Sequence, residues 1–212
     1  MTAILDAFGE AGEAGEGLGV TELSRRANLP KSTVSRIAAD LVEEGYLDRV
    51  DGQLFLGLRL FELGQSVERP RRLRRVAVST MTGLRDAIGL NVQLAIADGD
   101  DAVVIANARG RNPLLPAAHI GERLSRATTA LGAAFDAFEQ RQESSGATAA
   151  DAVTTYEVFH GEHVCVASPV HERGIAVAAV SVSGTIDELD PVEIAPFVRR
   201  AATMISQRLA AA

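Results

Sequence analysis

The chain has 212 residues, of which 47% are hydrophobic and 23% are charged, so it is long enough for about one or two domains and apolar enough to bury a core. Its 21 basic and 28 acidic residues give a net charge of −7, which argues against a protein that coats nucleic acid regardless of sequence. The single cysteine, Cys165, excludes an internal disulfide framework and fits a reducing compartment. The longest apolar stretch, 174–182, is too short for a membrane span, and the acidic start does not resemble a secretory signal. We therefore expect a cytoplasmic protein that does not contact a membrane.

Two helices joined by a tight turn are predicted early in the chain. Thr21 is placed to cap a helix that runs through Ala27, and the tripeptide 28–30 (Asn-Leu-Pro) forms the turn. From Lys31 onward the apolar residues recur at helical spacing and form one stripe, namely Val34, Ile37, Ala38, Leu41 and Val42. Gly45 ends this second helix.

A hairpin is predicted directly after these helices. Asp51-Gly52 accepts positive φ at both positions and lies between strand-like segments at 46–50 and 54–56. Helix, tight turn, helix and hairpin is the order of a winged helix-turn-helix, whose second helix enters the major groove of DNA.

The remainder of the chain mixes strands and helices. Helical patterns cover 58–67 and 71–88 with a break at Pro70, and further helices are expected at 128–141 and after Asp190-Pro191. Four strands are predicted as two hairpins, at 91–97, 102–108, 164–170 and 175–183. This second part is therefore expected to be α+β with an antiparallel-rich sheet.

The polar side of the second helix carries residues suited to DNA. The candidate contacts lie on the two early helices and near the hairpin tip and are Thr21, Lys31, Ser32, Thr33, Ser35, Arg36, Arg49 and Gln53. Arg36 can reach guanine O6 and N7 with two hydrogen bonds, whereas Lys31 at the positive end of the helix dipole suits a phosphate. The alternative is an ordinary solvated or protein-binding face, because residues 1–60 hold six basic and ten acidic side chains.

These segments together resemble one protein family. The stretch 29–36 (Leu-Pro-Lys-Ser-Thr-Val-Ser-Arg), followed by 41–47 (Leu-Val-Glu-Glu-Gly-Tyr-Leu), resembles the signature of the isocitrate lyase regulator (IclR) family. In the second part, 128–132 resembles the effector loop of that family, and 165–170 and 180–184 resemble its two late strands. The resemblance spans nearly the whole chain. It implies a winged helix-turn-helix domain, a linker helix and a C-terminal α+β, GAF-like effector-binding domain in a transcriptional regulator that is not an enzyme.

The resemblance also implies a pocket for a small organic acid, lined by Ala130, Leu131, Cys165, Ser181 and Ser183. Backbone N–H groups at a helix start suit a carboxylate, and the two serines lie on one side of their strand. The chain departs from the family in three ways. Ala133 stands where a lysine is common, and the connection before Cys165 is shortened. The acidic residue expected upstream of Cys165 is not evident at the matching position, where Thr154 or Thr155 falls, and Glu157 is a candidate substitute. The alternative is therefore a second domain that only oligomerises and binds no effector.

Two other groups of residues have possible chemistry. His160, Glu162, His163 and Cys165 are possible metal ligands, but their spacing matches no structural zinc pattern, so neither a metal nor another cofactor is expected. Cys165 with a neighbouring histidine would be the nucleophile of an enzyme, an alternative that the sequence spacing does not support.

Arginines are concentrated in a single run. Arg69, Arg71, Arg72, Arg74 and Arg75 follow one another within seven residues. They could contact DNA phosphates or a partner subunit, or form a solvated helix face.

We therefore predict a winged helix-turn-helix domain at 1–60, a linker helix at 61–72 and an effector-binding and oligomerisation domain at 73–212. The predicted partners are double-stranded operator DNA, a small organic acid and a second copy of the chain, since two linked recognition helices are needed to read two half-sites. A homodimer or homotetramer that acts as a repressor is the favoured form.

Overall fold

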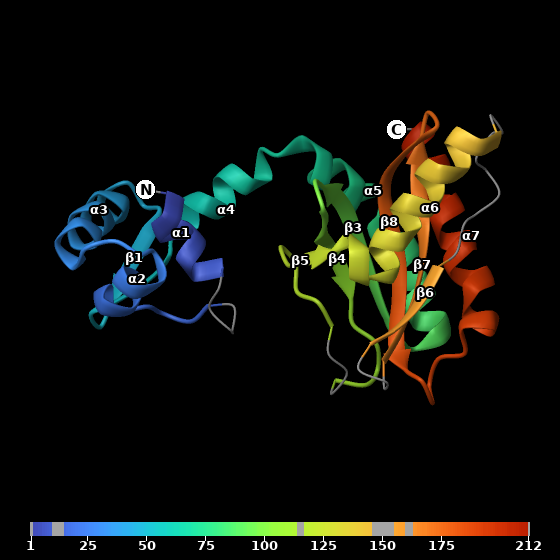
Figure 1. The fold of residues 1–212 in the computed structure, drawn as a ribbon, viewed down its shortest axis with the longest axis horizontal. Coiled ribbons are helices and arrows are strands. Elements are labelled where there is room, and N and C mark those ends of the chain that lie inside the picture. The colour runs from blue at the N-terminus through green and yellow to red at the C-terminus, as the bar shows by residue number, and fades with distance from the viewer. Residues whose placement is uncertain (1, 10–14, 114–116, 146–154, 160–162, 212) are drawn as a thin grey trace. The chain divides into compact units, whose positions relative to one another are not determined.

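The computed structural model describes residues 2–9, 15–113, 117–145, 155–159 and 163–211, with the backbone alone at 141–145 and 155–159 (Figure 1). Contacts within the chain divide it into two compact units, Met1–Glu68 and Arg69–Ala212. The predicted α+β class with an antiparallel sheet is confirmed. Within the described ranges, no helix is both long enough and apolar enough to cross a membrane.

The first unit is a small helical domain with one hairpin. Its elements are α1 (Thr2–Gly9), α2 (Val20–Arg26), α3 (Lys31–Glu43), β1 (Leu47–Val50), β2 (Gln53–Leu56) and α4 (Leu58–Gln65). Each element except α4 contributes apolar side chains to one core, which includes Ile4, Leu23, Val34, Leu41, Leu47 and Leu54. Val34, Ala38 and Leu41 of the predicted stripe are buried, so α3 is held by one face and its opposite face is left to solvent.

Backbone geometry in the first unit explains its turns. Asn28 has a φ of 51° between α2 and α3, and Asp51 and Gly52 have φ values of 49° and 80° at the hairpin tip. Positive φ at both central residues is the requirement of a type I′ hairpin, which confirms the predicted turn. The predicted cap at Thr21 is wrong, because α2 begins one residue earlier and Gly19, in extended backbone, is its N-cap residue.

The second unit is a single sheet covered on both faces. Its strands run in the order β5-β4-β3-β8-β7-β6, and all neighbouring pairs are antiparallel. The elements are α5 (Glu68–Ile88), β3 (Asn91–Asp98), β4 (Asp101–Ala108), β5 (Arg123–Ser125), α6 (Ala130–Ser145), β6 (Thr155–Phe159), β7 (His163–Glu172), β8 (Ile175–Thr185) and α7 (Pro191–Ala210). α5 and α7 share one buried cluster with one face of the sheet, and α6 shares another cluster with the opposite face.

Alternation along the strands separates these two faces. On β3 and β8, Val92, Leu94, Val180 and Val182 belong to the cluster of α5 and α7. Ala95, which follows Leu94, and Ala179, which precedes Val180, belong to the cluster of α6. Since neighbouring strand residues point to opposite faces, Gln93 on β3 and Ser181 on β8 also point toward α6.

The structure differs from the sequence-based expectation in three respects. The predicted helix break at Pro70 is wrong, because α5 begins at Glu68 and Pro70 lies in its first turn, where a backbone N–H has no partner within the helix. The short strands β5 and β6 were not predicted, and each lies at an edge of the sheet. The region 61–72, predicted as one linker helix, contains the end of α4, the joint at Ser66–Val67 and the start of α5.

We predict that Gly132→Ala lowers the free energy of unfolding of the second unit by about 1–3 kcal/mol. A Cβ atom at this position in α6 would lie 2.1 Å from the backbone oxygen of Arg126, so the helix start would have to move. Chemical denaturation monitored by circular dichroism measures the change.

The matched control is Gly83→Ala in α5, where a Cβ atom would meet nothing within 4 Å. This substitution should leave stability unchanged or raise it by about 0.4–1 kcal/mol, because alanine restricts the unfolded chain. Equal stabilities of the two variants would contradict the close approach of α6 to Arg126.

Candidate DNA interface and candidate sensor site

α3 presents an uncapped, positively polarised N-terminus to solvent. Its N-cap residue is Pro30, which supplies no side-chain hydrogen bond, and the first turn contains no acidic residue. The backbone N–H groups of that turn are therefore available to an external acceptor, and the helix dipole favours an anion there. Lys31, Ser32, Ser35 and Arg36 are exposed around this end of the helix, while Thr33 is half-buried.

Carboxylates neutralise the other cations of the first unit. Glu22 pairs with Arg25 at 2.6 Å and with Arg26 at 2.7 Å, and these two hydrogen-bonded guanidinium groups lower the pKa of Glu22 to about 2. Arg59 pairs with Glu62 at 2.8 Å. Among the described residues, Lys31, Arg36 and Arg49 form no ion pair. The net-acidic unit thus leaves its unpaired positive charge on the residues predicted to contact DNA.

The hairpin and α2 place the remaining candidate DNA contacts on the surface. Arg49 on β1 and Gln53 on β2 lie close to the Asp51-Gly52 tip, and both side chains are exposed. Thr21 lies in the first turn of α2 and is also exposed. These three residues and those of α3 all belong to the first unit, as a winged helix-turn-helix requires.

Three of the five predicted sensor residues lie together on the α6 face of the sheet. Strand register sets Ser183 of β8 opposite Cys165 of β7, and Ser181 is two residues further along the same face. Cys165 is buried in the cluster of α6, and Ser181 is fully buried. The hydroxyl groups of Ser181 and Ser183 have no hydrogen-bond partner among the described residues.

Two residues that sequence reasoning missed extend this cluster. Asn91 and Gln93 of β3 pair in register with Ser183 and Ser181, and both are buried. The Asn91 Oδ1 atom accepts a hydrogen bond from Gly110 N–H at 2.8 Å, but its Nδ2 atom has no partner in the described structure. The available signal was alternation, because the polar residues Asn91 and Gln93 alternate with Val92 and Leu94. A strand with two apolar faces would have no such polar residues. We call Asn91, Gln93, Cys165, Ser181 and Ser183 the sensor cluster.

The start of α6 covers the same face. Thr129 accepts a hydrogen bond from Gly132 N–H at 3.2 Å and donates one to the Ser125 carbonyl at 2.8 Å, so this threonine caps the helix. Ala130 and Leu131 follow the cap and are buried in the cluster that contains Cys165. Figure 1 shows α6 lying along the sheet over β7 and β8. All five predicted sensor residues are therefore found on one side of the sheet.

The sensor cluster offers hydrogen bonds without a charged side chain. An unsatisfied buried polar atom costs about 1–3 kcal/mol, and most such atoms in native proteins have a partner. Hydroxyl and amide groups next to a helix N-terminus are suited to hold the oxygens of a small polar ligand. The register also sets Glu157 of β6 opposite Cys165.

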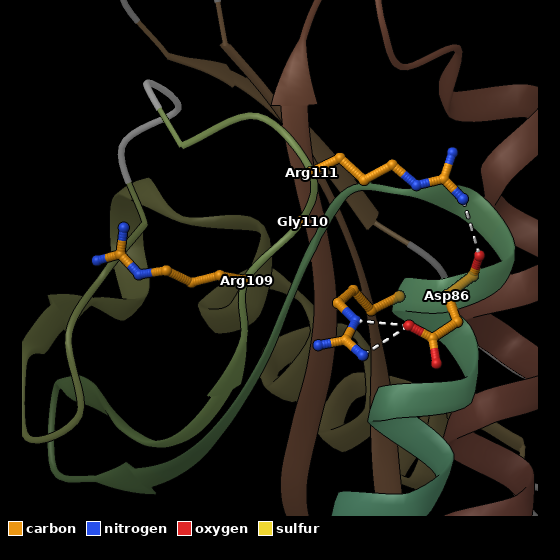
Figure 2. A pocket seen from close by; sticks show the side chains of 5 residues that line it. Asp86, Arg109, Gly110 and Arg111 are labelled. Carbon is orange, nitrogen blue, oxygen red and sulfur yellow. Dashed lines mark hydrogen bonds and ion pairs between the residues drawn. The ribbon is translucent and has the colours of Figure 1, made fainter.

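A separate cavity of about 330 Å³ lies at the C-terminal end of α5 and is lined by Arg85, Asp86, Arg109, Gly110 and Arg111 (Figure 2). Arg85 donates to the Asp86 carboxylate at 2.8 and 2.6 Å, and Arg111 donates to the Asp86 carbonyl at 3.3 Å. Figure 2 shows Arg109 and Arg111 extending in different directions, so these two guanidinium groups do not converge. Arg111 therefore satisfies a carbonyl at the helix end, and this cavity includes no member of the sensor cluster.

Metal-ligand chemistry finds no support in the described part of the chain. His160 and Glu162, two of the possible ligands, lie outside the described residues. Among the remaining residues no group of three or more histidine, cysteine or acidic side chains could hold an ion.

Comparison with known proteins relates both units to regulators of transcription. The IclR helix-turn-helix domain matches residues 2–51, and the domain described as "Bacterial transcriptional regulator IclR C-terminal" matches residues 65–158. The regulator XynR of Escherichia coli is 29% identical over 92% of this chain and 88% of its own length. The repressor AllR of the same species is 28% identical over 84% of this chain and 76% of its own length.

Solved structures have the same fold. An IclR homolog from Microbacterium hydrocarbonoxydans, complexed with 4-hydroxybenzoate, superposes with a TM-score of 0.82 at 22% identity and covers 100% of this chain and 98% of its own. The IclR of Thermotoga maritima superposes with a TM-score of 0.71 at 20% identity, over 99% of this chain and 98% of its own. The matched relatives are named as regulators and repressors, not as enzymes. The chain belongs to the IclR family of DNA-binding transcriptional regulators.

Proposed function

We propose that this regulator is a repressor that binds a specific operator through α3 and changes its operator affinity when a small organic acid occupies the sensor cluster. The observation that carries the DNA part is the charge distribution of the first unit. Lys31, Arg36 and Arg49 lack carboxylate partners among the described residues, while Arg25, Arg26 and Arg59 are neutralised. Relatives named as repressors support the direction of regulation.

Within this proposal, the residues of α3 divide by chemistry. The Arg36 guanidinium reads guanine in the major groove, because its forked donors match O6 and N7. Lys31 and the backbone N–H groups of the first turn bind a phosphate, and Ser32, Thr33 and Ser35 bind either a base edge or a phosphate. Thr21, Arg49 and Gln53 contact the DNA backbone or the adjacent minor groove.

The unpaired polar atoms of the sensor cluster support the effector part. Asn91 Nδ2 and the hydroxyls of Ser181 and Ser183 are buried without partners in the described structure, next to the N-terminus of α6. A carboxylate or hydroxyl of a ligand would satisfy them and thereby recover the cost of their burial. The solved relative in complex with 4-hydroxybenzoate supports an acid of about this size.

An exposed apolar face supports self-association. α4 has no buried residue, and Leu58, Phe61 and Leu63 are exposed, with Phe61 at 63%. We propose that a second copy of the chain covers this face, because a dimer presents two recognition helices to two half-sites. A C-terminal unit that only oligomerises remains the alternative to an effector sensor.

The DNA part predicts that wild-type protein prefers DNA from immediately upstream of its own gene over a scrambled duplex of equal length. Arg36→Ala should weaken binding to the upstream duplex by at least about 1 kcal/mol and affect the scrambled duplex less, because a bidentate base contact is lost. Fluorescence anisotropy at physiological salt measures both affinities.

Arg59→Ala is the control for this experiment, since Glu62 already neutralises Arg59 in the same unit. Its affinity should stay close to that of the wild type. An equal loss on both duplexes in Arg36→Ala would reduce Arg36 to a phosphate contact, and the absence of any preference in the wild type would overturn sequence-specific binding.

The sensor cluster predicts unequal effects of two buried serines on the ligand-free protein. Ser181→Ala should leave the free energy of unfolding unchanged or raise it, because it removes a hydroxyl that has no partner. Ser206→Ala should lower it by about 1–2 kcal/mol, since that hydroxyl accepts from His171 N–H at 3.0 Å and donates to the Ala202 carbonyl at 2.8 Å. Urea denaturation distinguishes the two results, and a comparable loss in Ser181→Ala would mean that its hydroxyl is already satisfied.

Occupation of the cluster predicts thermal stabilisation by small carboxylates. 4-Hydroxybenzoate and aliphatic acids of similar size would be screened by thermal shift, and binding should raise the melting temperature of the wild type. The double variant Ser181→Ala, Ser183→Ala should lose that rise. No stabilisation by any acid would favour the alternative of a domain that only oligomerises.

A further inference from the structure

The arginine run at the start of α5 carries positive charge in an unfavourable place. Residues 69–75 contain five arginines and no carboxylate, although a helix N-terminus already bears a positive partial charge. Glu68 is the one acidic residue in the first turn. Such an accumulation weakens the helix on its own, so an external anion that offsets the charge would stabilise it.

Two of the five arginines fasten α5 to its own domain. Arg72 donates two hydrogen bonds to the Glu172 carboxylate, at 3.0 and 2.8 Å, and these bonds lower the pKa of Glu172. Arg72 also donates to the Leu209 carbonyl at 3.0 Å. Arg69 donates to the Val177 carbonyl at 3.1 Å. These bonds connect the start of α5 to the β7–β8 hairpin and to the end of α7, so they hold this part of the helix in place.

The other three arginines form a continuous exposed face. Arg71, Arg74 and Arg75 are spaced at i, i+3 and i+4, which places them side by side on the helix. All three are exposed and make no ion pair or hydrogen bond with any residue that the structure describes. The buried side of α5 includes Leu73, Ala77 and Met81. We call Arg71, Arg74 and Arg75 the arginine face.

We propose that the arginine face is a second DNA contact, which binds backbone phosphates outside the helix-turn-helix unit. This inference rests on the proposed function, and it addresses the small number of cations that the first unit offers to DNA phosphates. Residues 1–60 hold six basic and ten acidic side chains, so the first unit supplies few cations for the phosphate contacts that dominate protein–DNA affinity. Only Ser66 and Val67 separate α4 from α5, which keeps the arginine face within a short chain distance of the DNA-binding unit.

The chemistry of the face favours phosphates over a protein partner. Guanidinium groups bind phosphate through two parallel hydrogen bonds, and a row of them matches the regular charge of a duplex backbone. Phosphate contacts carry no sequence information, so the face would raise affinity for any duplex and leave sequence preference to α3.

The test compares the salt dependence of DNA binding in three charge variants of the full chain. R71Q/R75Q removes two charges from the arginine face, and R71K/R75K keeps them. R109Q/R200Q removes two exposed arginines elsewhere in the same unit. Each protein is titrated against the upstream duplex and the scrambled duplex over a range of salt concentrations, and sedimentation measures its oligomeric state.

We expect R71Q/R75Q to reduce the slope of log K against log[salt] by about 1–2 and to weaken binding to both duplexes by the same factor, roughly threefold or more at low salt. R71K/R75K should retain the wild-type slope. R109Q/R200Q should retain it as well, which separates a local contact from a general effect of net charge.

Different outcomes overturn different claims. An R71Q/R75Q slope equal to that of R109Q/R200Q, with wild-type preference for the upstream duplex intact, would overturn the arginine face as a DNA contact and leave the proposed function standing. A loss of affinity accompanied by dissociation into smaller species would also overturn it, because the face would then join subunits. Equal wild-type affinity for the two duplexes would overturn the proposed function itself, and no binding to either would overturn both.

Discussion

The antiparallel register of β3, β8 and β7 is the constraint on which the second unit depends. It aligns Val92 with Val182 and Val182 with Val166 on one face, and Asn91 with Ser183 and Ser183 with Cys165 on the other. A slip of one residue would exchange the faces of a strand, placing serines against α5 and α7 and valines under α6. The apolar cluster of α5 and α7 therefore fixes the register. The same register brings the residues of the sensor cluster together, so no separate interaction is needed to align them.

Charge in the first unit follows a comparable logic. The net charge of the first unit alone would not suggest a DNA-binding domain, because neutralisation of DNA phosphates supplies much of the affinity. The structure shows where the positive charge remains. Glu22 and Glu62 pair with Arg25, Arg26 and Arg59, and the cations of α3 and the hairpin are unpaired among the described residues. Internal ion pairs thus remove positive charge from α2 and α4 and concentrate what remains on the face proposed to meet DNA.

The sequence predicted features that depend on local geometry and missed those that depend on pairing partners. The hairpin at Asp51-Gly52 and the stripe of α3 follow from positive φ and from helical periodicity, and both are present. Strand β5 has three residues and depends on its pairing with β4, so its own residues carry little signal. Strand β6 was missed although Tyr156, Val158 and Phe159 are strand-forming residues. Asn91 and Gln93 were missed because their importance comes from facing Ser183 and Ser181 across strands that are about ninety residues apart in sequence, a distance over which only the register brings them together. Gly19 replaced Thr21 as the cap because backbone conformation, not side-chain capping ability, decides where α2 begins.

α5 is the element that would connect the two proposed activities. The residues of β3 and β8 that alternate with the sensor cluster, Val92 and Val182 among them, share one buried cluster with Leu73 and Met81 of α5. A ligand changes DNA affinity only if it binds two arrangements of the protein unequally, and a close-packed interior passes a shift of the strands to whatever is packed on them. α5 would receive such a shift on its buried side and present the arginine face on its exposed side. In this scheme regulation requires no contact between effector and DNA, only two packings of α5 on the sheet that differ in how well Arg71, Arg74 and Arg75 reach phosphates.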